Sequence, residues 1–231
     1  SCPLHYKLKY LLSVPTAPTP ALSYGISVHN TLCDFCQLII DEQQVSSISE
    51  LLQKNWITEG YTGKKHEEQS YKQAEAMLTN YVETYVKEKP KTIAIELPFT
   101  FWLTKTLKAG GKIDRIDRLS DGRIEIVDYK TGSNIPTEKK VKEDLQLAFY
   151  ALAATTIKDE ILRRTPEEIV LTLHYLEADK KFSITKSAAE LELAKEKILA
   201  LIEEITTSEF RCRGGMFCKT CEYAMVCQSH T

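Results

Sequence analysis

Residues 111–130 constrain the fold more than any other part of the chain. Apolar residues recur at every second position at the start of RIEIVDYK (Ile124 and Ile126), which is the period of a β-strand, and in GKIDRIDRL isoleucines are interspersed with charged residues. Asp121 and Gly122 lie between the two runs, and an Asp-Gly pair is a strong signal for a tight hairpin turn. We therefore expect an antiparallel hairpin that brings Asp114 beside Asp128.

Side chains at alternate positions of a strand point to the same face. Asp128 and Lys130 therefore share one face with Ile124 and Ile126, while Tyr129 points to the other. Carboxylate oxygens bind Mg²⁺ or Mn²⁺, and a lysine beside them can orient an attacking water or stabilise developing negative charge. A single Asp-x-Lys triplet is more often an exposed ion pair, so the hairpin alone leaves both interpretations open.

The periodicity of the remaining sequence predicts helices before, between and after a run of strands. Helices are expected over about residues 1–12, within 42–65, and over 24–41, 67–88, 143–157 and 187–206, the last opening with a capping box at Ser187 and Glu190. Strands are expected over residues 92–99, 100–107, 168–176 and 181–186, in addition to the hairpin. This order predicts an α/β fold, a sheet with helices on both faces.

Composition excludes several classes of protein. The chain has 231 residues, 43% of them apolar and 27% charged, as expected of one globular domain and not of a disordered chain. The sequence contains neither an apolar run of about 18–20 residues nor a recognisable signal peptide, so we expect a cytoplasmic protein without a membrane partner. The net charge of −2 gives no general attraction to nucleic acid, although an acidic metal site can mask a basic patch.

Further polar residues lie around the hairpin. Glu96 falls within an apolar strand before it, and Gln146 and Tyr150 lie four residues apart on one helical face after it. His29 lies in the N-terminal helical region, where a lone histidine is more often a surface or core residue than a ligand.

Taken together, GGKIDRIDRLSDGRIEIVDYKTG followed by QLAFYALA resembles the RecB-type branch of the PD-(D/E)XK nucleases. The resemblance extends over nearly the whole chain and rests on G-x-x-D-R-x-D, D-Y-K-T-G and Q-x-x-x-Y in this order. It implies a restriction-endonuclease-like core with a central mixed sheet flanked by helices. It also implies a single nuclease domain over residues 1–231, with a helical part (1–65), a catalytic core (66–184) and a C-terminal helix with a cysteine cluster (185–231).

The resemblance implies a set of catalytic residues: Asp114, Asp128, Lys130, Glu96, Gln146 and Tyr150. Asp114 and Asp128 would bind Mg²⁺ or Mn²⁺, and Lys130 would be the catalytic lysine. His29 would add a nitrogen ligand, joined by the carbonyl of Tyr129. Gln146 and Tyr150 would position the active site and the DNA strand, whereas the role of Glu96 is less defined.

Seven cysteines in a chain without an export signal favour metal or cluster ligation over a disulfide framework. The segment CKTCEYAMVC places Cys218, Cys221 and Cys227 within reach of one metal centre, and three thiolates leave a fourth position open. From the spacing alone, zinc and an iron–sulfur cluster are both compatible, with Cys212 or His230 as the nearby fourth ligand.

Related AddB-type nucleases and CRISPR-associated exonucleases carry an iron–sulfur staple, in which one upstream cysteine joins three at the C-terminus. Cys2 matches that upstream position. The resemblance therefore implies a [4Fe–4S] cluster held by Cys2, Cys218, Cys221 and Cys227, with Cys212 as the competitor of Cys2.

Several other residues can be interpreted in two ways. Cys33 and Cys36 form another C-x2-C pair, but about 10 Å of helix would separate His29 from Cys36, so both cysteines are expected to be buried small hydrophobic residues. Trp56 and Trp102 could stack on DNA, although isolated tryptophans usually pack in the core. Basic residues near the hairpin could contact phosphates or form a solvated strand face: Lys105, Lys108, Lys112, Arg115 and Arg118.

The motifs and the resemblance predict a metal-dependent DNA nuclease that acts as a single-strand exonuclease, and the resemblance implies that it works with a UvrD-type helicase in DNA repair. The helicase would be part of the same chain or a separate subunit, and the substrate would be single-stranded DNA or duplex ends. Two other functions would use only some of these features. A non-cleaving DNA-binding module with a structural iron–sulfur cluster would not need the complete set of Asp114, Asp128 and Lys130. A redox carrier would need only the cluster.

Overall fold

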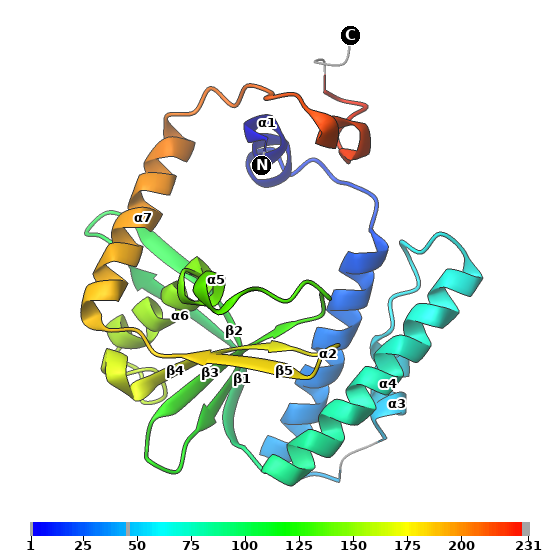
Figure 1. Ribbon diagram of the computed structural model, residues 1–231, viewed down its shortest axis with the longest axis vertical. Helices are drawn as coiled ribbons and strands as arrows, with labels where there is room; N and C mark the ends of the chain where they lie inside the picture. Colours follow the sequence, from blue (N-terminus) through cyan, green and yellow to red (C-terminus); the bar gives the residue numbers. More distant parts are fainter. Residues whose placement is uncertain (1, 45–46, 228–231) are drawn as a thin grey trace.

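A five-stranded mixed sheet lies between two layers of helices in the computed structural model, which describes residues 2–44 and 47–227 (Figure 1). The strands follow the chain in spatial order: β1 (Lys91–Trp102), β2 (Lys108–Arg118), β3 (Ile124–Lys130), β4 (Ile169–Tyr175) and β5 (Lys180–Ile184). Neighbouring strands are antiparallel except for β3 and β4, which are parallel. The chain between β3 and β4 crosses over one face of the sheet through two helices, which makes the parallel pairing possible.

The alternation of side chains along β3 divides the core into two layers. The helices on the two faces are α2 (Pro20–Ile40), α3 (Ile48–Asn55), α4 (Lys64–Glu88), α5 (Glu138–Lys142), α6 (Leu145–Thr156) and α7 (Ala188–Thr206), with a short 3₁₀ turn at Pro166–Glu168. Ile124 and Ile126 pack into the cluster that includes α6 and α7, whereas Val127 and Tyr129 pack into the cluster that includes α2, α3 and α4. The predicted α/β architecture with helices on both faces is confirmed. Within the described residues, no helix is both long and apolar enough to cross a membrane.

Two predicted boundaries differ from the structure. Helix α2 begins at Pro20, before the expected start near residue 24, because Thr19 caps it by accepting the N–H of Leu22 at 3.3 Å and proline suits the first helical turn. The strand predicted over residues 100–107 is wrong. Strand β1 continues to Trp102, and a turn follows in which Thr104 Oγ1 accepts the N–H of Leu107 at 3.0 Å.

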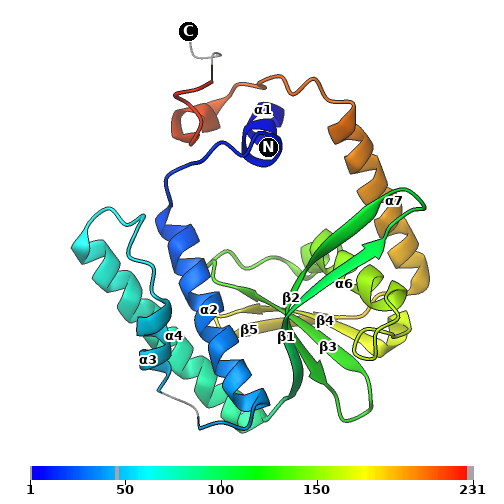
Figure 2. The same ribbon diagram turned by 180° about the vertical axis from the view of Figure 1, so that it is seen from behind.

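The two ends of the described chain pack against each other, as Figures 1 and 2 show from opposite sides. The N-terminal helix α1 (Pro3–Tyr6) continues as one π-helical turn (Lys7–Leu11), and the C-terminal segment contains a short 3₁₀ helix (Met216–Thr220). His5 and Lys9 lie 3.0 and 3.2 Å from the Glu222 carboxylate. The Tyr223 hydroxyl donates to the carbonyl of Val14 at 3.1 Å. The N-terminal segment therefore lies beside the C-terminal cysteines.

The central strand β3 should depend strongly on the apolar side chains that it buries. Ile126 is 0% exposed, so Ile126→Ala should lower the free energy of unfolding by about 2–5 kcal/mol, measured by urea denaturation. The control is Leu193→Ala on α7, where the side chain is 58% exposed and the expected change is within about 0.5 kcal/mol. Equal effects of the two substitutions would contradict the assignment of Ile126 to the core.

Candidate active site

The backbone N–H and carbonyl of Tyr129 lie at the centre of the candidate site. The N–H donates to Asp114 Oδ2 at 2.9 Å, and the carbonyl accepts from His29 Nε2 at 3.1 Å. His29 Nδ1 lies 3.6 Å from Asp114 Oδ2. The β2–β3 register pairs Arg115 with Val127, which puts Asp114 at the level of Asp128 as predicted. Helix α2 and two strands thus meet at one residue.

A candidate cation site lies next to the Tyr129 backbone. Among the described residues, His29, Glu96 and Asp114 each offer a ligand atom, and these atoms all lie within 4.8 Å of one another. Glu96 lies in β1 with a φ of 47°, a left-handed conformation that is uncommon for a residue other than glycine. Lys112 on the adjacent strand forms an ion pair with Glu96. The three donors suit a divalent cation.

Asp128 is the centre of a second network, and it is only 2% exposed. Its Oδ1 accepts from Gln146 Nε2 at 2.8 Å and from the Tyr150 hydroxyl at 3.1 Å. Lys130 Nζ lies 2.7 Å from Asp128 Oδ2 and donates to Gln146 Oε1 at 2.8 Å. Because Gln146 and Tyr150 lie one helical turn apart on α6, both reach the same carboxylate. The structure thus brings together all four predicted members of this group.

The site carries negative charge that its own residues only partly compensate. Burial and the charge of Asp128 raise the pKa of Asp114, and the opposing effects of His29 and the Tyr129 N–H are smaller. Burial and the charge of Asp128 also raise the pKa of Tyr150, so its phenol stays protonated and donates to the carboxylate. A bound divalent cation would relieve the repulsion between Asp114 and Asp128.

A buried network on the opposite face of the sheet fixes Tyr129. Arg115 is 4% exposed, and its Nη1 donates to the hydroxyls of Tyr81 and Tyr129 at 2.5 and 2.8 Å. Its Nη2 lies 3.0 Å from Asp117 Oδ2. The suggestion that Arg115 contacts phosphates is therefore wrong. The spacing of Arg115 and Asp117, two apart on one strand face, is the sequence signal that could have indicated a buried pair.

The cysteines near the chain ends lie close together, and all are partly exposed. Desolvation raises the pKa of the Cys218 thiol, and the neighbouring thiols of Cys212, Cys2 and Cys227 raise it further. Cys221 follows in the same segment, where its N–H donates to the Cys218 carbonyl at 3.3 Å. His230, considered above as a ligand, lies outside the described residues.

The second C-x2-C pair is separate from this group. Cys36 is 1% exposed in the core between α2 and α4, as predicted, and burial raises its thiol pKa to about 11. Cys33 is only partly buried.

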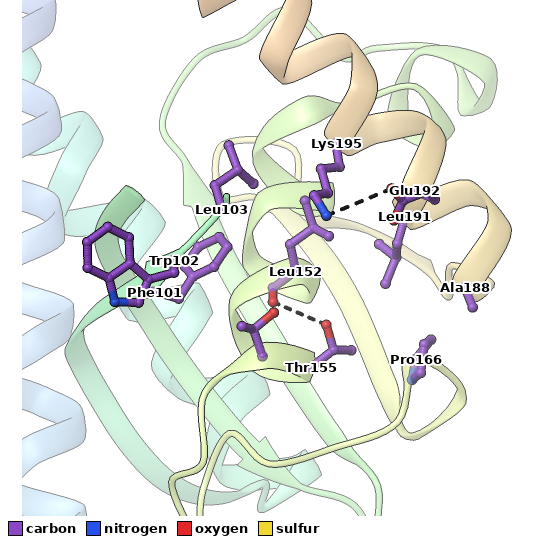
Figure 3. A pocket seen from close by; sticks show the side chains of 11 residues that line it. Phe101, Trp102, Leu103, Leu152, Thr155, Pro166, Ala188, Leu191, Glu192 and Lys195 are labelled. Atoms are coloured by element: carbon purple, nitrogen blue, oxygen red, sulfur yellow. Dashed lines mark hydrogen bonds and ion pairs between the residues drawn. The ribbon is translucent and has the colours of Figure 1, made fainter. Parts of the chain in front are cut away.

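A cavity of about 240 Å³ lies apart from these networks, between the tip of the β1–β2 hairpin, α6 and α7 (Figure 3). Apolar side chains, among them Phe101, Leu152 and Leu191, line much of it. Its ion pair joins Glu192 and Lys195 at 3.8 Å. This cavity therefore lacks the convergent carboxylates of the candidate active site.

The sequence model of the PD-(D/E)XK nuclease superfamily matches residues 1–228. The chain belongs to this superfamily. Enzymes of the superfamily usually use divalent metal ions, and the cluster of His29, Glu96 and Asp114 is compatible with one.

The chain is also similar to parts of larger proteins. It is 35% identical over 95 residues to the B subunit of an ATP-dependent helicase/deoxyribonuclease of Streptococcus agalactiae, an alignment that covers 40% of this chain and 9% of that protein. It is 42% identical over 66 residues to the protein of the same name from Streptococcus mutans, covering 28% of this chain and 6% of the relative. The chain therefore spans a small part of these relatives.

A solved structure from Eubacterium rectale, named as a candidate exonuclease, shares the fold. The TM-score is 0.55 at 14% sequence identity, over 96% of this chain and 80% of that one.

His174 on β4 should make the stability of the domain depend on pH. Its ring lies beside those of Tyr81 and Tyr129, and burial lowers its pKa to about 4, an effect that Asp179 at 3.3 Å only partly offsets. An unfolded histidine has a pKa of about 6.5, so between these values the unfolded chain binds more protons. The free energy of unfolding should therefore fall as the pH is lowered from about 6.5 to about 4, by on the order of 2–3 kcal/mol.

Urea denaturation at a series of pH values would measure this contribution. His174→Gln removes the titrating ring, and the difference in unfolding free energy between parent and variant should change across that pH range. A constant difference would contradict the prediction.

Proposed function

We propose that this chain is a metal-dependent deoxyribonuclease, a single domain that hydrolyses phosphodiester bonds in DNA, and specifically a single-strand exonuclease. Membership of the nuclease superfamily supports the reaction class. The observation that carries the proposal is the position of two networks on either side of one residue, Tyr129. The His29, Glu96 and Asp114 cluster lies on one side of Tyr129, and the Asp128 network lies on the other.

The proposed ligands of Mg²⁺ or Mn²⁺ are His29, Asp114, Asp128 and the carbonyl of Tyr129, with Glu96 as a further oxygen donor. Oxygen donors and one imidazole suit these ions. The raised pKa of Asp114 supports this assignment, because a bound cation would offset the repulsion between the Asp114 and Asp128 carboxylates. When bound, the ion would supply Lewis acidity for water activation and neutralise phosphate charge.

The remaining residues would orient the substrate and stabilise charge. The Lys130 ammonium is held between Asp128 and Gln146, so it would donate to a phosphate oxygen or to the attacking water as negative charge develops. Gln146 and Tyr150 would keep the Asp128 carboxylate in one orientation. Because the Tyr150 phenol remains protonated, this support would persist at neutral pH.

We also propose a helicase partner, of the UvrD type, in the same chain or as a separate subunit. The support is the name of the streptococcal relatives, which describes them as parts of a helicase/deoxyribonuclease, although the chain covers at most 9% of their length. The substrate would be single-stranded DNA or duplex ends, and the nuclease would act with its helicase in DNA repair in the cytoplasm.

A [4Fe–4S] cluster held by Cys2, Cys218, Cys221 and Cys227 is the second proposed cofactor. The packing of the two chain ends and the proximity of several thiols to Cys218 support a shared centre. Cys212 competes with Cys2 for the fourth position. Such a centre would tie the first and last segments of the domain together.

Cleavage of end-labelled single-stranded DNA with Mn²⁺ under anaerobic conditions would test the nuclease. Lys130→Ala should slow cleavage by about 100-fold or more, because a charge-stabilising group is removed, and EDTA should abolish it. The matched control is Lys139→Ala, an exposed lysine on α5 that should leave the rate unchanged. Failure of the folded, cluster-loaded parent to cut would favour the non-cleaving binding module instead.

Anaerobic iron reconstitution would test the cluster. Cys218→Ser should lose the visible iron–sulfur absorption and lower the thermal midpoint, whereas Cys33→Ser should keep both. Separate Cys2→Ser and Cys212→Ser variants would identify the fourth ligand. Normal iron content in Cys218→Ser, or zinc in place of iron in the parent, would reject the proposed ligation.

A further inference from the structure

We propose that the solvent-facing side of the β1–β2 hairpin is a track for single-stranded DNA, and that Trp102 and Lys108 form its base-stacking platform. The track consists of Pro98, Thr100 and Trp102 on β1 and Lys108, Gly110 and Lys112 on β2. The proposal rests on the proposed nuclease function, because it describes how the substrate strand reaches the same site.

The strand register assembles these residues on one face. Pro98 pairs with Lys112, Thr100 with Gly110, and Trp102 with Lys108. All six are exposed. The intervening residues Phe99 and Phe101 point to the other side, where each is 5% exposed in the core against α6. The core therefore holds one side of the hairpin, and its other side forms a continuous solvent-exposed surface.

Trp102 is placed to stack on a base. Its side chain is 55% exposed, and Lys108 Nζ lies 5.0 Å from the ring centroid. Trp102 is also one of the residues that line the cavity, but in Figure 3 its indole points away from Leu152 and Leu191 on the other side of that cavity. Trp56 differs, since the rings of Tyr24, Tyr61 and Tyr71 surround it. The expectation that tryptophans pack in the core holds for Trp56 and is wrong for Trp102.

The charge of the hairpin is opposite to that of the whole chain. Residues 97–113 contain three lysines and no acidic residue, whereas the chain carries a net charge of −2. Lys108 and Lys112 lie on the exposed face with Gly110 between them, where a side chain would meet the Phe99 carbonyl oxygen at 2.8 Å. Positive charge beside an exposed aromatic ring is the usual combination at sites for single-stranded nucleic acid.

The track is continuous with the candidate active site. Lys112 pairs with Glu96, one of the three clustered ligand candidates, and Asp114 follows two residues later on β2. At about 3.3 Å per residue, the six steps along β2 from Lys108 to Asp114 span about 20 Å, a length that a few nucleotides can bridge. A base stacked on Trp102 would therefore belong to a strand that reaches the cluster. Single-stranded DNA is favoured over a duplex, because only unpaired bases offer free faces for stacking.

Fluorescence of Trp102 would report on binding without cleavage. The chain has two tryptophans, so Trp56→Phe leaves Trp102 as the only source of tryptophan emission. Titration with an oligothymidylate of about 12 nucleotides in EDTA should quench this emission. In the background with both tryptophans, Trp102→Ala should weaken binding about 5- to 150-fold, and Trp102→Phe should restore most of it. Lys108→Ala should reduce the slope of log affinity against log salt by about 0.7.

The matched control is Lys180→Ala on β5, at the other edge of the sheet. Lys180 also lies over an aromatic ring, 4.7 Å from the centroid of Phe182, and its loss should leave DNA affinity unchanged. Absence of quenching, together with parental affinity in Trp102→Ala, would overturn the track.

A parallel cleavage assay with Mn²⁺ separates this proposal from the nuclease function. Binding that depends on Trp102 in a protein that does not cleave would support the track and refute the nuclease. Cleavage that requires Lys130 but proceeds at the parental rate and affinity in Trp102→Ala and Lys108→Ala would refute the track and support the nuclease.

Discussion

The anchoring of Tyr129 is the constraint on which the rest of the site depends. A strand residue normally uses its N–H and carbonyl for the sheet ladder, but here the N–H binds Asp114 and the carbonyl binds His29. The phenol on the other side is held by Arg115 and Tyr81. Since both sides of the residue are fixed, strand register, the position of α2 and the separation of the candidate ligands follow from one set of contacts.

The two buried ionic networks, around Arg115 and around Asp128, fix the positions of side chains more than they stabilise the fold. Transfer of Arg115 and Asp128 out of water is costly, and the cost is offset in each case by a counter-ion and by hydrogen bonds with tyrosine hydroxyls, which accept from Arg115 and donate to Asp128. Such pairs contribute little net free energy, so the apolar layers around Ile126 and Val127 must supply the stability of β3. The ionic networks hold the Asp128 carboxylate and the Tyr129 backbone in single orientations, which a charged site requires.

Turn residues and strand alternation in the sequence predicted the features that depend on residues close together in the chain. The Asp121-Gly122 turn is present, with Gly122 at a φ of 91°, and Asp128 and Lys130 share a face because strand alternation requires it. The sequence did not reveal that Arg115 is buried, because its partner Tyr81 lies 34 residues earlier in the chain, on α4. It also misplaced the end of β1, and the exposure of Trp102 depends on that strand continuing past residue 100.

The ion pairs between the two chain ends are weak, so a metal centre bound by the terminal cysteines would contribute most of the stabilisation of this contact. The contacts of His5 and Lys9 with Glu222 involve side chains that are 26–43% exposed, and solvent and salt screen such pairs, so they contribute little to stability. A centre that joined Cys2 to Cys218 would close a loop of more than 200 residues, and the loop-entropy model assigns about 5 kcal/mol to a cross-link of that length. A shared metal centre would therefore outweigh the ion pairs between the ends. Its loss would release α1 and the C-terminal segment, while the sheet and the Tyr129 contacts would keep their own core.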